Sequence, residues 1–233
     1  MTNELTIHVT KNIEAVVTPV SQEVSLDTPI FALNWFNTRS LTLYNIYNIL
    51  ASRSVTKVGG EVVIKGKVLN VLAGDPNDRR DILLIVRYPS GPRFLSMLQS
   101  TYFKLVSVLR TAAVAQFTFG FTHPTAHASA KPDHPKEMAY MIHHYRGADR
   151  SNSLQQLASE HGINVVYMGQ TVAHLATRTP DTPDAILPVL SDGIAIFQAN
   201  AVDQLKSFFS SEAFLAIATA HESSFSATFR RLL

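Results

Sequence analysis

The chain has 233 residues, 46% of them hydrophobic and 16% charged, with a formal net charge of +2, which predicts one large or two small packed domains and excludes extended disorder. The sequence contains no cysteine, so a disulfide framework, a thiolate nucleophile and a cysteine-ligated zinc are excluded. Its basic residues are scattered, and the densest groups are pairs such as Arg79-Arg80. We therefore expect no nucleic-acid partner.

Residues 1–28 are interpreted as an N-terminal extension, in which LTIHVT (5–10) can add an edge strand. The extension lacks the apolar core of a signal peptide, and no apolar run approaches the roughly 20 residues that span a bilayer. These features predict a cytoplasmic protein without a membrane partner.

Residues 29–122 predict the order strand, helix, strand, strand, helix, strand. IFALNWF (30–36) is a short apolar strand, and SLTLYNIYNIL (40–50) carries apolar residues at helical spacing. EVVIKGKVLNVL (61–72) alternates charged and apolar residues, which is typical of a half-exposed strand. The remaining predicted elements are a buried strand at DILLIVRY (81–88), a helix whose first turn holds Pro92, and a strand at AQFTFGF (115–121).

Residues 137–233 repeat this order after a proline-broken linker at 123–136. Its first helix is predicted from a capping box at Ser153 and Gln156, and its second from an N-cap at Asn200. Residues 81–122 can be laid on residues 192–233 at a constant offset of 111, which indicates a tandem repeat.

Two such units predict an α+β fold with ferredoxin-like β-α-β-β-α-β domains at 29–122 and 137–233. Helices would cover only one face of each four-stranded sheet. We therefore expect the two sheets to pack on each other as an intramolecular dimeric α+β barrel.

The segments FALNWF, VGGEVVIKGKV, DILLIVRYPSGPRFLSMLQSTYFKLV and LRTAA resemble small domains of the dimeric α+β barrel superfamily, related to EthD-like and antibiotic-biosynthesis monooxygenase domains. The resemblance covers residues 30–122, and its closest members have no assigned reaction. It implies the barrel architecture and, by relation to the oxygenases, a substrate-binding asparagine at Asn34. The tryptophan and histidine that accompany such an asparagine in haem-binding relatives have no clear counterparts, so we predict no cofactor.

Standard catalytic and metal motifs are absent from the sequence. His123, His127 and His134 lie in the predicted linker without a carboxylate cluster, so we predict no metal site there.

The first strands of the two copies place polar residues among apolar ones. Setting FALNWFN on YMIHHYR aligns Asn34 with His143 and Trp35 with His144. Buried polar groups need partners, so these residues either address a ligand or bond within the core. Neighbours in a strand face opposite ways, so only one of the two histidines can face a cavity.

The candidate catalytic residues are His143, as a proton carrier, and Asn34. The candidate ligand-binding residues are Arg87, Trp35 and Tyr145, with Arg87 able to receive an anion or to pair at the rim. The predicted function is a cofactor-independent oxygenase- or isomerase-like enzyme acting on a small organic substrate. The alternative is a non-catalytic small-ligand-binding or structural protein, and either is compatible with a homodimer of such chains.

Overall fold

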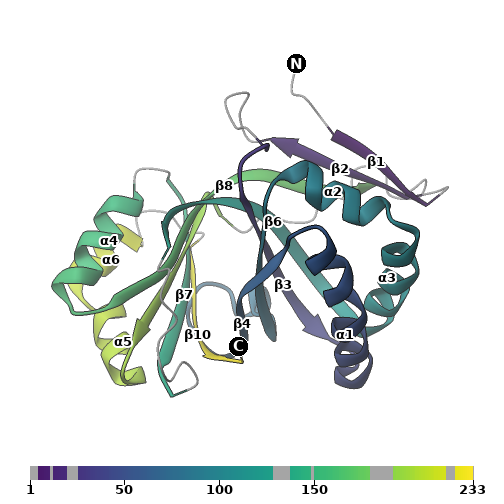
Figure 1. Ribbon diagram of the computed structural model, residues 1–233. Coiled ribbons are helices and arrows are strands. Elements are labelled where there is room, and N and C mark those ends of the chain that lie inside the picture. Colours follow the sequence, from purple (N-terminus) through teal and green to yellow (C-terminus); the bar gives the residue numbers. More distant parts are fainter. Residues whose placement is uncertain are drawn as a thin grey trace. The chain divides into compact units, whose positions relative to one another are not determined.

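The structure is a computed structural model that describes residues 5–10, 13–19, 26–127, 137–147, 150–178, 191–218 and 224–232. The described residues form helices and strands that are interspersed along the chain (Figure 1). Their bounds are β1 Leu5–Thr10, β2 Ile13–Pro19, β3 Ile30–Thr38, α1 Leu41–Lys57, β4 Glu61–Ala73, the 3-10 helix η1 Pro76–Asp78, β5 Ile82–Tyr88, α2 Gly91–Gln99, α3 Thr101–Ala113, β6 Val114–His127, β7 Ala139–Tyr145, α4 Arg150–Glu160, β8 Asn164–Arg178, β9 Gly193–Ala199, α5 Val202–Phe209, α6 Glu212–Ala218 and β10 Phe225–Arg231.

The chain forms two compact units that interleave along the sequence. Unit 1 comprises residues 1–63, 82–122 and 172–189, and unit 2 comprises residues 64–81, 123–171 and 190–233. The divisions fall within strands β4, β6 and β8, so each of these strands contributes residues to both units.

The strands are hydrogen-bonded in the order β1-β2-β8-β6-β3-β5-β4-β10-β7-β9, and β8 also pairs with β9. Eight strands therefore form a closed order, and the pairings are antiparallel, as in β3 with β5 and in β7 with β9. This confirms the expected mixture of helices with an antiparallel sheet. The predicted edge strand at 5–10 is β1, which stands at one end of the order.

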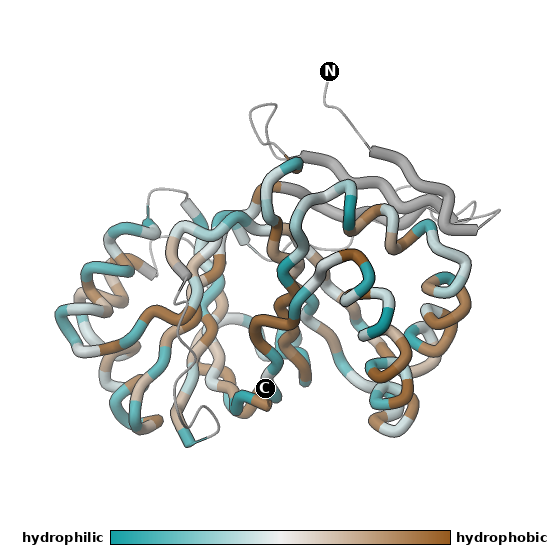
Figure 2. Tube along the Cα trace, in the orientation of Figure 1, coloured by the Kyte–Doolittle hydropathy of each residue, from teal (hydrophilic) through white to brown (hydrophobic). Residues whose placement is uncertain are grey.

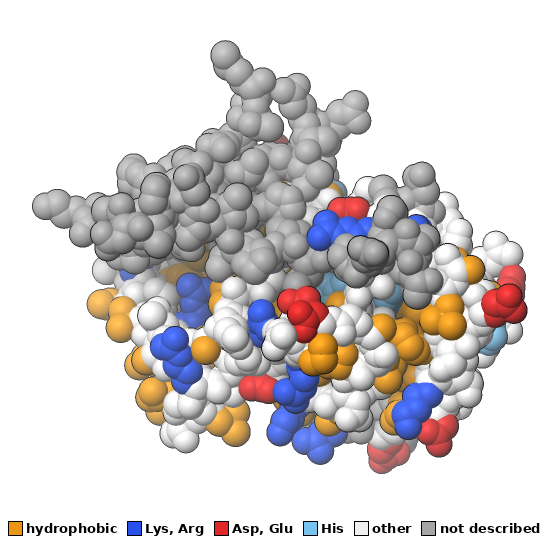
Figure 3. Space-filling view, turned by 180° about the vertical axis from the view of Figure 1, so that it is seen from behind, with side chains coloured by type: hydrophobic (Ala, Val, Ile, Leu, Met, Phe, Trp, Pro, Cys, Tyr) orange, Lys and Arg blue, Asp and Glu red, His pale blue; other side chains and the backbone are white. Residues whose placement is uncertain are grey.

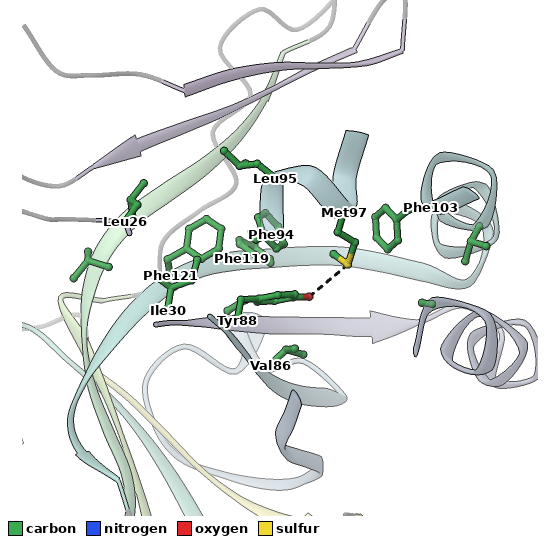
Figure 4. Close-up of a cluster of buried hydrophobic side chains, with 14 residues drawn as sticks. Leu26, Ile30, Val86, Tyr88, Phe94, Leu95, Met97, Phe103, Phe119 and Phe121 are labelled. Atoms are coloured by element: carbon green, nitrogen blue, oxygen red, sulfur yellow. Dashed lines mark hydrogen bonds between the residues drawn. The ribbon is translucent and has the colours of Figure 1, made fainter. Parts of the chain in front are cut away.

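The strands of unit 1 bury one face against helices α1, α2 and α3. Ile30 and Ala32 of β3 and Phe119 and Phe121 of β6 belong to a core cluster with Phe94 of α2. The Phe94 ring lies 5.0 Å from that of Phe121 and 5.8 Å from that of Phe119 (Figure 4). The burial of these rings fixes which face of the sheet points toward the helices.

Unit 2 packs in the same manner against α4, α5 and α6. Met141 and Tyr145 of β7 lie in a cluster with Leu157, Leu205 and Phe214 of the three helices. Apolar residues concentrate along the strands of both units in Figure 2. We call the opposite side of each set of strands its helix-free face.

The segment after Pro92 forms two helices in place of the single predicted one. Ser100 separates α2 from α3, because its hydroxyl donates to the Met97 carbonyl at 2.8 Å and accepts from the Phe103 amide at 3.2 Å. Ser211 separates α5 from α6 with the same two bonds, to Phe208 and Phe214, at 2.8 and 3.2 Å. A side chain that satisfies both ends of a break explains why the helices stop and restart there.

Three predicted boundaries differ from the structure. Helix α4 begins at Arg150, ahead of the predicted capping box at Ser153, and α5 begins at Val202 with Ala201 as its N-cap in place of Asn200. Strand β6 continues to His127, five residues into the segment predicted as a linker. The remainder of that segment, including His134, lies outside the described residues.

Candidate ligand site

Two of the predicted ligand-binding residues, Trp35 and Arg87, lie on the helix-free face of unit 1. Residues of β3 with even numbers, such as Ala32, join the helix-side core, so Trp35 points to the other side. Along β5, Val86 and Tyr88 belong to the helix-side core, which places Arg87 on the same helix-free face as Trp35.

Cross-strand pairing arranges this face in three rows across β5, β3 and β6. The register of β3 with its two neighbours puts one residue from each strand into every row. The rows are Arg87, Phe31 and Thr122; Ile85, Leu33 and Gly120; and Leu83, Trp35 and Thr118. Neighbouring residues within a row lie side by side. Side chains in different rows can contact the same ligand only if the ligand is long enough to extend from one row to the next.

The β6 edge of this face is made of small side chains, Thr118, Gly120 and Thr122, which we call the threonine strip. Gly120 is buried, yet a Cβ added to it would meet no described heavy atom within 4 Å, its chain neighbours aside. Thr118 is 2% exposed, and its hydroxyl has no hydrogen-bond partner among the described residues. The strip therefore combines space with an unsatisfied polar group, and buried hydroxyls are rarely left in that state.

The Thr122 hydroxyl is already used, because it donates to the Phe31 carbonyl at 3.3 Å. Trp35, which stands opposite Thr118, is fully buried. Arg87 is half-buried near the end of β5, and a guanidinium is a side chain that can bind an anion.

The corresponding edge of unit 2 is filled by aromatic rings. On its helix-free face, β10 places Phe225, Ala227 and Phe229 opposite His144, Ile142 and Tyr140 of β7. The Phe229 ring stacks on Tyr140 at 5.3 Å, and the Phe225 ring meets His144 at 5.9 Å. Where unit 1 has two threonines and a glycine, unit 2 has two phenylalanines and an alanine.

Asn34 lies on the helix side of unit 1 and does not share a face with Trp35. Its Nδ2 donates to the Ala32 carbonyl at 3.2 Å and to the Leu84 carbonyl at 3.3 Å. These bonds match the interpretation in which Asn34 bonds within its own sheet, and they leave its Oδ1 as the atom available to a ligand.

His143 lies on the helix side of unit 2, in contact with aromatic rings. Its Nδ1 is 2.8 Å from the Ser226 hydroxyl, and its ring is 5.1 Å from Phe214 and 6.2 Å from Tyr145. The Nε2 atom is buried and has no hydrogen-bond partner among the described residues. Burial lowers the pKa of His143 to about 4, with a further lowering from Arg150 and an opposing contribution from the Phe225 backbone.

His144 faces the other way, and therefore it is the histidine on the helix-free face of unit 2. Its Nδ1 lies 3.4 Å from the Ser191 hydroxyl, and burial lowers its pKa to about 3, with His143 adding to the effect. Both imidazoles are thus neutral near pH 7.

Tyr145 lies on the same face as His143, within the helix-side core. Burial, and to a smaller extent the charge of Asp192, raise the pKa of Tyr145 to about 12. The ring lies against Gly193 in the neighbouring strand, where a Cβ would stand 2.3 Å from the tyrosine ring. Tyr145 and His143 are therefore adjacent, whereas Trp35 and Arg87 belong to a different unit.

Other features of the described residues do not suggest a site. They contain no group of three or more His, Cys, Asp or Glu placed to hold a metal ion. An apolar recess of about 180 Å³ lies between Leu26, Gly91 and Phe94, but no part of it is wide enough for a water molecule.

Sequence reasoning missed the threonine strip. The alternation in AQFTFGF drew attention to the three phenylalanines, which do form the packed face, and the small residues between them face the other side. The constant offset of 111 also concealed the difference between the last strands of the two halves. It aligns Gly120 with Arg231, whereas the strand registers place Ala227 in the position of Gly120.

No protein-family model and no curated protein matches the sequence. Among solved structures, the chain is similar to a presumed monooxygenase from Fusobacterium nucleatum, with a TM-score of 0.51, 12% identity and coverage of 88% of this chain and 93% of that chain. It is also similar to an anthrone oxidase-like protein, with a TM-score of 0.50, 12% identity and coverage of 90% and 94%. A protein of unknown function from Rhodopseudomonas palustris is 24% identical over 46% of this chain and 87% of that chain, with a TM-score of 0.41.

The first two likenesses show the fold, which is that of the ferredoxin-like, dimeric α+β barrel proteins. This agrees with the architecture that the sequence resemblance implied.

Proposed function

We propose that the protein binds a small, planar organic molecule on the helix-free face of unit 1, and that it acts on this molecule as an oxygenase- or isomerase-like enzyme. The observation that carries the proposal is the threonine strip, which joins a buried glycine beside open space to a buried hydroxyl without a partner. A buried hydroxyl that lacks a hydrogen bond costs about 1–3 kcal/mol, and a ligand that supplies the bond would recover that cost.

The composition of the face indicates the chemistry of the ligand. Its floor is made of apolar side chains with Trp35 at one end, which favours a flat, apolar body. Thr118 and Arg87 lie two strands and four residues apart, about 10 Å across and about 14 Å along the sheet. Because an arginine side chain spans part of this separation, a fused two- or three-ring aromatic with an anionic group would reach both residues.

His143 is proposed as a proton carrier only for a substrate that reaches the helix side of unit 2, because its imidazole points away from the helix-free face. A neutral imidazole whose Nδ1 is held by Ser226 can use Nε2 to accept or donate a proton, depending on its tautomer. A pKa near 4 makes it a weak base, so it is better suited to polarise a carbonyl or phenol than to remove a proton from a weak acid. Asn34, through Oδ1, and Tyr145 are proposed as supporting polar groups.

The alternative is a binding protein without turnover. It is favoured by the hydrogen bonds that already engage Asn34 and by the low basicity of His143.

We also propose that the chain arose by tandem duplication of one β-α-β-β-α-β unit, at 29–122 and 137–233, related to EthD-like domains. The matched serine breaks between helices support this, as do the strand registers, which fit an offset of 109 between β3 and β7 and of 111 between β5 and β9. The fourth strand fits an offset of 107, so one copy has lost or gained four residues after the helices. A cytoplasmic location and a homodimer belong to the same proposal, and analytical ultracentrifugation would test the latter.

The anion preference is tested by calorimetric titration with anthraquinone-2-carboxylate and with its carboxamide. We expect Arg87→Gln, which copies Gln198 of unit 2, to weaken carboxylate binding about tenfold, because it removes one charge-assisted contact. The carboxamide should bind both proteins equally, and Arg93→Gln on the exposed surface of α2 should change neither affinity. Equal carboxylate affinity in the wild type and Arg87→Gln would remove Arg87 from the site.

Turnover is tested separately by oxygen uptake with anthrone under air. The enzyme hypothesis predicts saturable oxygen uptake, and a tenfold loss of uptake in His143→Gln with unchanged affinity for anthraquinone-2-carboxylate would assign proton transfer to His143. Binding without uptake would exclude anthrone as a substrate and favour the non-catalytic alternative, and uptake that survives His143→Gln would exclude that residue as the proton carrier.

A further inference from the structure

The helix layer of unit 1 exposes large apolar side chains on two adjacent helices. Ile46 and Ile49 of α1 are 43% and 66% exposed, and Leu105 and Val108 of α3 are 69% and 67% exposed. Tyr102 of α3 is 41% exposed, and its hydroxyl donates to the Leu50 carbonyl of α1 at 3.2 Å, which joins the two helices at the surface. Figure 3 shows orange side chains gathered at the left, over these helices. Soluble proteins rarely expose so many large apolar side chains together without a partner.

The same layer is basic and contains no acidic residue. Helices α1, α2 and α3 contain five cations and no Asp or Glu, so their charges sum to +5. The cations are Arg53, Lys57, Arg93, Lys104 and Arg110.

The helix layer of unit 2 differs in both respects. Helices α4, α5 and α6 contain two cations, Arg150 and Lys206, and three acids, Glu160, Asp203 and Glu212, so their charges sum to −1. Their most exposed large apolar residues are Val202 at 38% and Leu215 at 37%. The basic and apolar character is therefore specific to one layer and is not a general property of the fold.

The charge distribution decides which occupant fits this layer. A second copy related by two-fold symmetry would bring cations of α1 and α3 against the same cations, with no acid to balance them. An anionic lipid surface offers apolar depth to the aliphatic side chains and phosphate groups to the lysines and arginines, and it requires no complementary groove.

We propose that the α1–α3 layer of unit 1, with Ile49 and Leu105 as inserted apolar residues and Arg53 and Lys57 as phosphate contacts, binds the surface of an anionic lipid bilayer. No described helix is long and apolar enough to cross a membrane. Peripheral binding does not require such a helix, so this proposal departs from the sequence prediction of no membrane partner, which was based on the lack of a spanning segment and of a signal peptide. The proposal is independent of the ligand site on the opposite face of unit 1.

The test is co-sedimentation of the full chain with vesicles of phosphatidylcholine alone or mixed equally with phosphatidylglycerol. We expect binding to the mixed vesicles only, weakened by added salt. Arg53→Gln with Lys57→Gln should weaken it about tenfold or more, because each cation near an anionic surface contributes about 1 kcal/mol. Ile49→Asn with Leu105→Asn should abolish it, while the far-ultraviolet circular dichroism of both variants stays that of the wild type.

The matched controls are Leu215→Asn and Lys206→Gln in unit 2, which should bind as the wild type does. Equal binding to both kinds of vesicle, or a loss of binding in the controls, would contradict the proposal. A wild-type oligomer that Ile49→Asn with Leu105→Asn dissociates, without vesicle binding by any form, would show that the layer is a protein interface.

Discussion

At the residue scale, the two units differ most at the last strand of their helix-free faces. Thr118 and Gly120 occupy positions where unit 2 has Phe225 and Ala227, and the smaller side chains leave a buried hydroxyl and open space. In unit 2 the corresponding positions are filled by phenylalanine rings, which contact Tyr140 and His144 of the neighbouring strand. The difference is one of side-chain volume at matching positions of the two strand registers.

The space beside Gly120 predicts an unusual tolerance to substitution. Gly120→Ala should leave the free energy of unfolding unchanged or raise it by about 0.5–1 kcal/mol, because the added methyl meets no described atom and glycine is unfavourable within a strand. Gly193→Ala is the contrasting variant, since its Cβ would stand 2.3 Å from the Tyr145 ring, and it should cost about 1–3 kcal/mol. Urea unfolding of both variants measures this, and equal losses would show that the space at Gly120 is filled.

The two buried histidines predict acid sensitivity. Their pKa values, about 4 for His143 and about 3 for His144, lie below the value of about 6.5 in an unfolded chain. As the pH falls below 6.5, the histidines are protonated in the unfolded chain but stay neutral in the folded protein. The free energy of unfolding therefore falls until the pH reaches the pKa of the folded state. For His143 the loss between pH 7 and pH 4 is on the order of 3 kcal/mol.

The free energy of unfolding, measured by denaturant titration at pH 7 and pH 4.5, should differ less between the two pH values in His143→Gln than in the wild type. Arg93→Gln, a change at an exposed cation of α2 in unit 1, serves as the control and should keep the wild-type slope. A wild-type stability that does not fall between these two pH values would contradict the burial of neutral imidazoles.

At the scale of elements, the sequence predicted where α2 begins but not that the helical segment after it is divided at Ser100. Pro92 predicts the start of α2, and in the structure the Ser90 hydroxyl caps this helix by accepting from the Arg93 amide at 3.4 Å. The division at Ser100 was missed because the apolar periodicity continues through it. Only the local bonds of the hydroxyl reveal it, since Ser100 bonds to residues on both sides of the break.

These caps give a prediction that applies to both units. Ser100→Ala and Ser211→Ala should each lower the free energy of unfolding by about 1 kcal/mol, because each leaves a helix amide and carbonyl without its hydroxyl partner. Ser96→Ala is the matched control within α2, since its exposed hydroxyl bonds only the Arg93 carbonyl of its own helix, and it should cost almost nothing. Losses no larger than that of Ser96→Ala would show that the serines do not hold the breaks.

The order of strands and helices could be predicted because alternation and helical spacing are local signals. The register of the last strand could not be predicted, because it depends on a four-residue difference between residues 29–122 and residues 137–233 that no composition signal marks. The same error placed Arg231 over Gly120 and concealed the threonine strip. Asn34 and His143 were singled out as polar residues in apolar strands, but strand parity alone does not tell which face meets the helices.

At the scale of the whole molecule, the duplication pattern and the family resemblance led to the fold that the solved structures share. The composition of the compact units was not predictable in the same way. Strands β4, β6 and β8 each contribute to both units, which is a property of long-range pairing that a linear division at residues 123–136 does not express. A surface property also appears only at this scale, since the basic, apolar layer of unit 1 is visible only when three helices are considered together.

The central claim, a ligand site on the helix-free face of unit 1, is tested most directly through the single tryptophan of the chain, Trp35, which lies opposite Thr118. The measurement is quenching of its fluorescence by anthraquinone-2-carboxylate in the wild type and in Thr118→Phe, which copies the filled edge of unit 2, with Val108→Phe on the exposed surface of α3 as the size-matched control. The account predicts saturable quenching in the wild type and the control and at least a tenfold loss of affinity in Thr118→Phe. Quenching of equal affinity in all three proteins, or no saturable quenching in the wild type, would contradict it.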